Sequence, residues 1–288
     1  MGTARIQRLA AVGWVESAML CFRLRLAGLV VLAVGLSWPA TERACAAAGQ
    51  LAVQTGASIP AAAQQLFTLA NQVRAAEGVG PLKWDQALGT AALVHCKRMV
   101  AEGPIAHRYE GEADLTVRAR NAGAHFSLIE ENVAFGSYAA TIHQGWLDSP
   151  GHRANLLNSQ VDSVGIAVVS GGGALYAVAD YARAVPVLGR EQVEAGVAAL
   201  IRASGLSIAR DPAEARAYCA RGSQDTRSRD TSRSALSIVW ENADLSALPA
   251  GLTDRIASGR YRSAVVGACN PMQTEPGFTS YRVAVIFY

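Results

Sequence analysis

Three side chains have the types and the order in the chain that chemistry at one site would need. They are His107, Glu131 and His152. An imidazole titrates close to neutral pH and is a common metal ligand, and a carboxylate can orient it or share a metal with it. The chain has five histidines, and all of them lie between His95 and His152. Any imidazole or histidine–metal chemistry must therefore come from the first half of the mature chain.

The local sequence predicts the state of two of these imidazoles. Residues 149–151, Ser-Pro-Gly, open a helical turn, so His152 lies at a helix N-terminus. The positive end of the helix dipole there lowers the pKa of an imidazole and keeps it in the neutral form that binds metal. His95 follows a helical apolar pattern with Leu88, Ala92 and Met99, which favours a core histidine over a metal ligand.

Length and composition limit the class of protein. A chain of 288 residues allows one large domain or two modest ones, and an apolar content of 51% is too high for a disordered chain. The net charge of +3 is small, and no basic stripe is interleaved with aromatic residues. We therefore expect no nucleic-acid partner.

The N-terminal segment predicts export. Arginines at positions 23 and 25 precede an uncharged run over 26–38, and small residues follow over 44–48. This is the order of a secretory signal, so we assign residues 1–48 to a signal peptide, with Met19 as an alternative start. The apolar run is too short to cross a bilayer comfortably, and the residues before Cys45 make a poor lipoprotein signal. We expect a secreted or periplasmic protein with no transmembrane span in its mature form.

Export gives meaning to the cysteines. Cys96, Cys219 and Cys269 remain after cleavage near residues 46–48, and an odd number allows at most one intrachain bridge. Cys219 and Cys269 share the second half and are the natural pair. Cys96 lies within a helical pattern and is expected to be a buried, inert thiol.

The order of elements predicts an α/β domain over 61–186, after a linker at 49–60. We expect helices near 58–77, from 85, near 115–122 and from 141, with strands entered at 131–136 and at 164–169 and 175–181. The second half, 187–288, predicts a smaller α+β module with helices at 192–203 and from 211, a polar loop at 222–234, and strands at 235–240, 261–268 and 280–288. It contains no histidine and no nucleophile pattern, so its function stays open.

Taken together, the motifs resemble the CAP superfamily, which includes the cysteine-rich secretory, antigen 5 and pathogenesis-related proteins. The resemblance is to its bacterial, cysteine-poor branch and covers residues 64–186. It rests on the following segments in family order: Leu82-Lys83-Trp84-Asp85, His107, Glu131-Asn132-Val133-Ala134, Trp146, Ser149-Pro150-Gly151-His152-Arg153, Asn155 and Val164-Gly165-Ile166-Ala167. It implies a three-layer α-β-α sandwich whose cleft holds two histidines and two acidic residues.

The chain departs from the family pattern in two places. His107 and His152 match the cleft histidines and Glu131 matches the first glutamate, but Ser149 stands where the second glutamate is expected. Asp148 lies one position before the place of that second glutamate, and on a helix its side chain would point about 100° away from the side chain at position 149. Glu130 replaces the usual glycine before the Glu-Asn pair.

Three functions fit these residues. The first is a binding protein whose cleft of His107, Glu131, Ser149 and His152 holds a divalent metal such as zinc on His107, His152 and Glu131, beside a small or lipid-like ligand, as the resemblance implies. The second is an extracellular hydrolase, a peptidase or esterase, with Ser149 or a metal-bound water as nucleophile. The third is a cell-envelope interaction module that binds a protein partner through its C-terminal half and whose cleft is vestigial. We favour the first, because nothing in the sequence orients an imidazole as the base of a triad.

Overall fold

The computed structural model describes residues 60–221, 236–271 and 277–288. The predicted signal peptide, nearly all of the predicted linker and the predicted loop at 222–234 lie outside these residues. Between residues 61 and 186 the chain forms, in order, α1 (Ala61–Ala76), β1 (Lys83–Trp84), α2 (Gln86–Glu102), α3 (Leu115–Asn121), β2 (Phe126–Gly136), α4 (Ala139–Asp148), α5 (Pro150–Leu157), β3 (Ser163–Gly171) and β4 (Ala174–Ala184).

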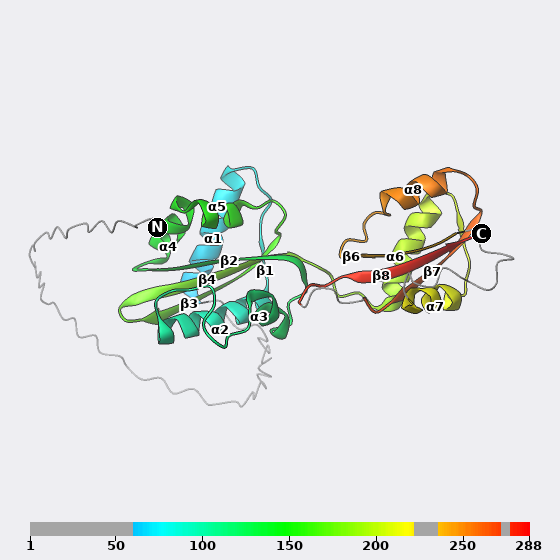
Figure 1. Cartoon of the computed structure of the whole chain (residues 1–288). Helices are drawn as coiled ribbons and strands as arrows, with labels where there is room; N and C mark the ends of the chain where they lie inside the picture. The colour runs from blue at the N-terminus through cyan, green and yellow to red at the C-terminus, as the bar shows by residue number, and fades with distance from the viewer. Residues whose placement is uncertain (1–59, 222–235, 272–276) are drawn as a thin grey trace, which may run out of the picture. The chain divides into compact units, whose positions relative to one another are not determined.

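These strands form one four-stranded sheet in the order β1-β3-β4-β2. β1 pairs with β3 in parallel, whereas β4 is antiparallel to both β3 and β2. The helices α1, α4 and α5 lie on one face, and α2 and α3 lie on the other (Figure 1). The predicted three-layer α-β-α sandwich is therefore confirmed, and β2 is an edge strand of its sheet.

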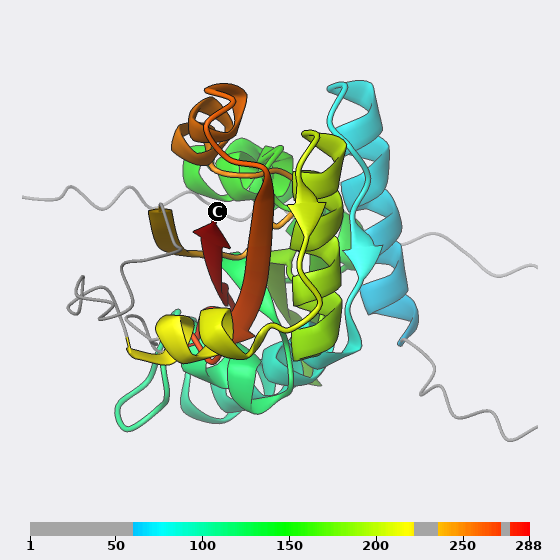
Figure 2. The same cartoon turned by 90° about the vertical axis from the view of Figure 1, so that its right-hand side faces the viewer.

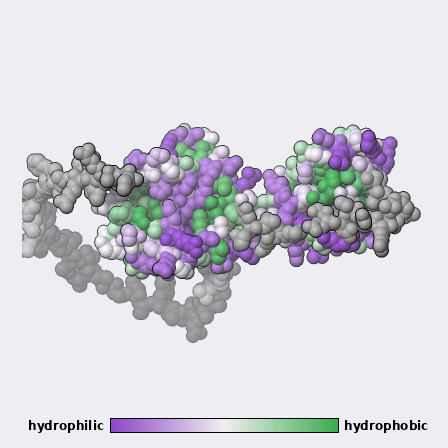
Figure 3. Space-filling model, in the orientation of Figure 1, coloured by the Kyte–Doolittle hydropathy of each residue, from purple (hydrophilic) through white to green (hydrophobic). Residues whose placement is uncertain are grey.

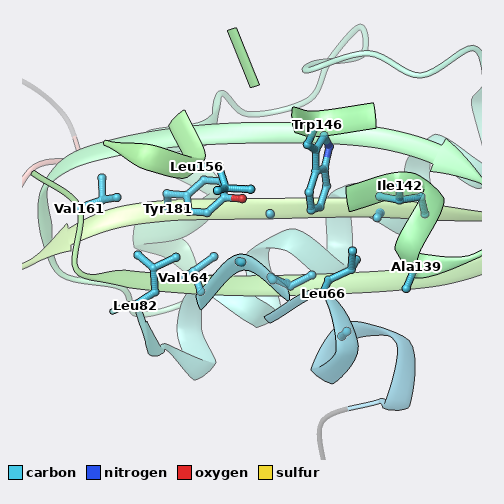
Figure 4. Packing of buried hydrophobic residues seen from close by; sticks show 14 residues of the cluster. Leu66, Leu82, Ala139, Ile142, Trp146, Leu156, Val161, Val164 and Tyr181 are labelled. Atoms are coloured by element: carbon cyan, nitrogen blue, oxygen red, sulfur yellow. The ribbon is translucent and has the colours of Figure 1, made fainter. Parts of the chain in front are cut away.

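The alternation of side chains along β4 builds both cores of this sandwich. Ala177, Ala179 and Tyr181 join the cluster under α1, α4 and α5, in which Trp146 and Ile142 of α4 are fully buried (Figure 4). Val178 and Ala182 belong to the alternate set of residues and join the clusters under α2 and α3. Successive side chains of a strand point to opposite faces, so this one strand contributes to two layers of packing.

In the view of Figure 3, hydrophilic side chains surround separate apolar patches on the surface.

The second half of the chain forms a smaller sandwich. Its elements are α6 (Arg190–Ala203), β5 (Ser207–Ile208), α7 (Ala213–Arg221), β6 (Leu236–Asn242), α8 (Ala250–Ala257), β7 (Ser263–Cys269) and β8 (Tyr281–Phe287). The sheet order is β5-β7-β8-β6. Residues of α6 and α8 pack together on one side of it, and α7 packs on the other (Figures 1 and 2).

This second sandwich repeats the connectivity of the first. The strand order is the same, and the pairs β5–β7, β7–β8 and β6–β8 have the same directions as β1–β3, β3–β4 and β2–β4. A glycine lies at the same helix-to-sheet contact in both. A Cβ on Gly165 of β3 would overlap the backbone of α2, and one on Gly267 of β7 would overlap the backbone of α7. The predicted α+β module is thus a shorter version of the first fold, with no counterpart of α5 between α8 and β7, a stretch that the structure describes in full.

A disulfide joins Cys219 of α7 to Cys269 at the end of β7. Counted from Gly165 and Gly267, Cys269 takes the place of Ala167, which packs against α2 in the first sandwich. α7 has 9 residues where α2 has 17. The covalent link therefore lies where the shorter helix has less packing surface to hold it on its sheet.

Several elements differ from the sequence-based expectation. The two-residue strands β1 and β5 and the helix α8 were not predicted, and β2 begins at Phe126 rather than at residue 131. Such short strands carry no periodicity of their own and exist because a neighbouring strand pairs with them. Asp85 caps α2 as expected, since its side chain accepts a hydrogen bond from the Leu88 amide at 2.9 Å. Within the ranges that the structure describes, no helix is long and apolar enough to cross a membrane.

Candidate functional site

The two cleft histidines meet beside β2, which carries Glu131. His107 lies in the loop between α2 and α3, and His152 lies in the first turn of α5. The centres of their imidazole rings are 6.5 Å apart, with 50° between the ring planes. The fold thus brings together three of the four residues expected in the cleft, His107, Glu131 and His152, from three separate segments.

Polar contacts from β2 hold α5 in place. Asn132 donates from its side chain to the carbonyl of His152 at 2.9 Å. Asn155 in turn donates to the carbonyl of Glu131 at 3.2 Å and to the side-chain oxygen of Asn132 at 3.0 Å. The Glu-Asn pair of β2 and the His-Arg-Ala-Asn segment of α5 are therefore held together by hydrogen bonds, and these bonds fix the position of His152.

The far end of α5 is anchored by a buried arginine. Arg74 of α1 is 1% exposed and donates to the carbonyls of Gly80, Leu156, Asn158 and Val161 at 2.7–3.1 Å. Glu130, the unexplained departure from the family pattern, accepts from the Asn158 side chain at 2.9 Å and so ties β2 to the end of the same helix. Both contacts position the helix that carries His152.

Glu131 is the centre of a buried network. One of its carboxylate oxygens lies 2.8 Å from Nδ1 of His107, and the other accepts from the guanidinium of Arg118 on α3. Arg118 also donates to the carbonyl of His107 at 3.2 Å, so it fixes both the carboxylate and the loop that presents the imidazole. The side chain of His107 is 59% exposed, whereas that of Glu131 is 4% exposed. The outer edge of the His107 ring, with Nε2, is left to meet a ligand.

The pKa values of the two imidazoles move in opposite directions. The hydrogen bond and the negative charge of Glu131 raise the pKa of His107 despite its partial burial. Burial, followed by the charge of His107, lowers the pKa of His152. The prediction of a neutral His152 therefore agrees with the structure, although burial is the main cause. The pKa of His107 shifts the other way because a carboxylate contacts this imidazole directly.

Asp180 is a carboxyl group that the sequence analysis missed. It is fully buried on β4, directly across from Glu131, and neither of its oxygens has a hydrogen-bond partner among the described residues. Burial and the negative charge of Glu131 raise the pKa of Asp180 well above its ordinary value. In its protonated form Asp180 can donate to the Glu131 carboxylate. A charged residue within the apolar run 177–182 was the only signal for it in the sequence.

His95 contacts the same network from α2 without being open to a ligand. Its Nδ1 lies 2.8 Å from a carboxylate oxygen of Glu112, and its Nε2 lies 2.9 Å from the carbonyl of Ala106. Burial favours the neutral acid, but hydrogen bonds from the Tyr109 amide and from His95 lower the pKa of Glu112 overall. With both ring nitrogens occupied, His95 is the satisfied core histidine that its helical pattern indicates.

Ser149 and Asp148 do not complete an acidic tetrad. Ser149 joins α4 to α5 and, within the described residues, no hydrogen bond links it to an imidazole. The carboxylate of the exposed Asp148 accepts from Gln144 of the same helix at 2.8 Å. Cys96 is buried and free, and burial raises its pKa to about 12, so this thiol is protonated at neutral pH.

The geometry sets limits on a metal site. Two imidazoles on one tetrahedral zinc hold their ring centres roughly 5 Å apart, given Zn–N distances of about 2.0–2.1 Å. The ring centres of His107 and His152 are 6.5 Å apart, so they must approach by about 1.5 Å to share an ion. In the part of the chain that the structure describes, no group of three or more His, Cys, Asp or Glu side chains is arranged to hold a metal. The donor chemistry, two imidazoles of which one is oriented by Glu131, is of the kind that zinc accepts, although the two rings stand too far apart to share an ion in this arrangement.

At the equivalent positions of its sheet, the second sandwich has no carboxyl groups. Gly165 of β3 pairs with Asp180, which pairs with Glu131. At the corresponding places Gly267 pairs with Ala284, which pairs with Val239. The positions equivalent to the two buried carboxyl groups are thus apolar, so among the described residues the second sandwich has no counterpart of the Glu131–Asp180 pair.

Comparison with known proteins matches the first sandwich. The model of the family described as "CAP: Cysteine-rich secretory protein family" matches residues 67–181. Two proteins of Bacillus subtilis (strain 168) are similar: the uncharacterized membrane protein YlbC is 30% identical over 36% of this chain and 31% of its own, and the uncharacterized protein YkwD is 26% identical over 40% and 45%. An extracellular SCP-domain protein of Bacillus anthracis str. Ames, solved by crystallography, is 30% identical over 45% of each chain with a TM-score of 0.40. The chain spans less than half the length of either Bacillus subtilis relative.

Proposed function

Residues 67–181 are a CAP domain, and from that premise we propose that the protein is an exported binding protein whose His107–His152 pair holds a divalent metal such as zinc. One observation carries this proposal: the ring centres of the two imidazoles are 6.5 Å apart, while Nδ1 of His107 is held by Glu131. Histidine ligands of metals commonly donate their second ring nitrogen to a carboxylate in this way. A small or lipid-like ligand beside the ion is the second part of the proposal.

Each residue has a defined part in this function. His107 and His152 would supply the two nitrogen ligands, and water would fill the remaining positions. Glu131 would orient His107, and Arg118 would hold Glu131. Bound zinc acts as a Lewis acid or simply holds a ligand, depending on what reaches its open positions.

The proposal is tested by titrating the protein with ZnCl₂ in a calorimeter, beside a His107→Ala/His152→Ala double variant. The wild type should bind one ion, and the double variant should lose that binding. His125→Ala is the matched control, because His125 is exposed and lies outside the cleft. Equal weak binding by all three proteins would remove the metal from the proposed function.

The pH dependence offers an independent check. Zinc must displace the proton of His107, whose pKa Glu131 raises. The affinity should therefore climb with pH, by about tenfold per unit while His107 is protonated, and level off above its pKa. A pH-independent affinity would mean that His107 is not a ligand.

The hydrolase alternative is less well supported. A serine nucleophile needs an imidazole within hydrogen-bond reach and a third group that orients this imidazole. Glu131 orients His107, yet among the described residues no hydrogen bond connects Ser149 with either histidine. Turnover of a peptide or ester library that disappears in Ser149→Ala would favour the hydrolase over the binding protein.

Export to an oxidising compartment is part of the same proposal. The disulfide between Cys219 and Cys269 supports it, because such bonds persist mainly outside the reducing cytosol. Mass spectrometry of the protein recovered from its source would locate the first residue of the mature chain. A mature protein that begins at Met1 or at Met19 would contradict export through this signal.

A further inference from the structure

A cavity of about 400 Å³ opens in the first sandwich, on the side of the sheet that α2 and α3 cover. It lies between these two helices and the segment 111–113, and we call it the α2–α3 cavity. Ligand sites are typically cavities of about 300–1,000 Å³, whereas packed interiors contain few voids larger than a water molecule. None of the residues expected in the cleft, His107, Glu131, Ser149 and His152, lines this cavity. It is therefore a separate feature of the domain.

Small and apolar residues create the hollow. Ala91 and Val94 of α2 face Ala122, the residue after α3, and Ala113 closes one side. Alanine at three of these positions leaves unfilled the space that larger side chains would occupy between packed helices. Val94 lines the cavity and is 60% exposed, so an apolar surface leads from solvent into it.

The charged groups along the wall are already paired. Glu112 contacts His95 and the Tyr109 amide, and Arg118 is bonded to Glu131. Arg98 is bonded to Glu102 one helical turn away. The Nε of Arg118 has no hydrogen-bond partner among the described residues, but the charge of this guanidinium is already compensated by Glu131. A charged molecule would therefore lose its hydration in a largely apolar cavity without gaining an uncompensated opposite charge. The exposed amide of Asn121 is a neutral polar group on the same wall.

We propose that the α2–α3 cavity binds an uncharged, mainly apolar small molecule. The proposal deepens the ligand-binding part of the proposed function and rests on it, because it places that ligand between α2 and α3 rather than between the histidines. Arg118 lines the cavity and also holds Glu131, so one side chain borders both sites.

The test uses two fluorescent probes with the same aromatic body. N-Phenyl-1-naphthylamine is uncharged, and 8-anilino-1-naphthalenesulfonate carries a sulfonate. The full chain should bind the uncharged probe saturably, with a Kd at least tenfold below that of the sulfonate. Equal or tighter binding of the sulfonate would overturn the assignment of ligand class. Absence of saturable binding of either probe would overturn the site.

Variants then locate the probe. Val94→Glu places a charge at the rim without disturbing the core, and it should weaken binding of the uncharged probe at least fivefold. Ala122→Leu fills the cavity and should have a similar effect. Lys97→Glu is the matched control, because Lys97 is exposed on the same helix and does not line the cavity. Unchanged binding in both cavity variants would show that the probe binds elsewhere.

The two proposals can fail separately. His107→Ala/His152→Ala should lose zinc binding and keep the affinity for the uncharged probe, whereas Val94→Glu should keep zinc binding and bind the probe at least fivefold more weakly. Loss of the probe in the histidine variant, with Val94→Glu unaffected, would move the ligand to the histidine cleft and refute the α2–α3 cavity. If the wild type does not bind zinc but still binds the uncharged probe in the α2–α3 cavity, the metal proposal fails and the cavity proposal is supported.

Discussion

Replacing Glu131 with glutamine should reveal how the buried charges of the first sandwich are shared. Arg118 and Glu131 form an ion pair whose side chains are 5% and 4% exposed. Removing one partner of a buried pair typically costs about 3–5 kcal/mol of stability, because the other charge is left buried without compensation. Asp180 lies across the strand pair and can change this outcome.

Asp180 should recover part of that loss. Burial and the charge of Glu131 raise its pKa in the wild type. Glu131→Gln removes this repulsion while Arg118 remains, so Asp180 ionises and takes over the charge. Asp180→Asn alone replaces a neutral acid and should change stability by no more than about 1 kcal/mol. The double variant Glu131→Gln/Asp180→Asn leaves Arg118 without a carboxylate and should lose the full amount of about 3–5 kcal/mol of unfolding free energy. This loss should exceed the sum of the losses in the two single variants by at least about 1 kcal/mol.

Urea denaturation followed by the indole NMR signals of Trp84 and Trp146 measures this cycle. Both indoles belong to the first sandwich, whereas Trp240 of the second would mix another transition into the fluorescence. Glu110→Gln, at an exposed position, serves as the control. If the two single effects add to within about 0.5 kcal/mol, Asp180 does not exchange charge with Glu131, and the reasoning fails.

Three further outcomes are expected. An NMR titration should place the pKa of His107 above that of His152, and the reverse order of the two pKa values would contradict the role of the Glu131 carboxylate. The stability that protonated His107 contributes to the fold is then present below its unfolded pKa and is lost as the pH rises through its folded pKa. Replacing Cys219 and Cys269 by serine should cost the second sandwich about 4 kcal/mol, as expected for a link across 50 residues, measured by calorimetry against the intact protein. Gly165→Ala should cost at least about 3 kcal/mol in urea denaturation because its Cβ would overlap α2, and a neutral effect would show that the helix can move away.

Local signals in the sequence were sufficient for much of the fold. The apolar period of 86–102 and the capping residue Asp85 predict α2, and the structure contains both. The family order of the motifs predicts that His107, Glu131 and His152 meet. The start of β2 could not be predicted from the sequence, because residues 126–130 pair with β4 in a register that no local pattern indicates.

The remaining features depend on contacts between distant segments. Asp180 belongs to the site only because β4 pairs with β2 in the register that places it opposite Glu131. Arg118 was not predicted to take part, because a helical arginine is ordinarily a surface residue and only the packing of α3 against β2 buries it. The repeated connectivity of the two halves was likewise hidden, since the equivalent positions hold Val239 and Ala284 in place of carboxyl groups.

Residue types and their spacing were therefore enough to identify the domain, the candidate imidazoles and the cysteine pair, because each is encoded within a short segment or in the order of segments. The protonation tendency of His107 could not be predicted in the same way. A pKa depends on burial and on the nearest charge, and the charge beside His107 comes from a residue 24 positions away. Tertiary structure alone decided that His107 faces a carboxylate, that His152 is partly shielded, and that a hollow remains between α2 and α3.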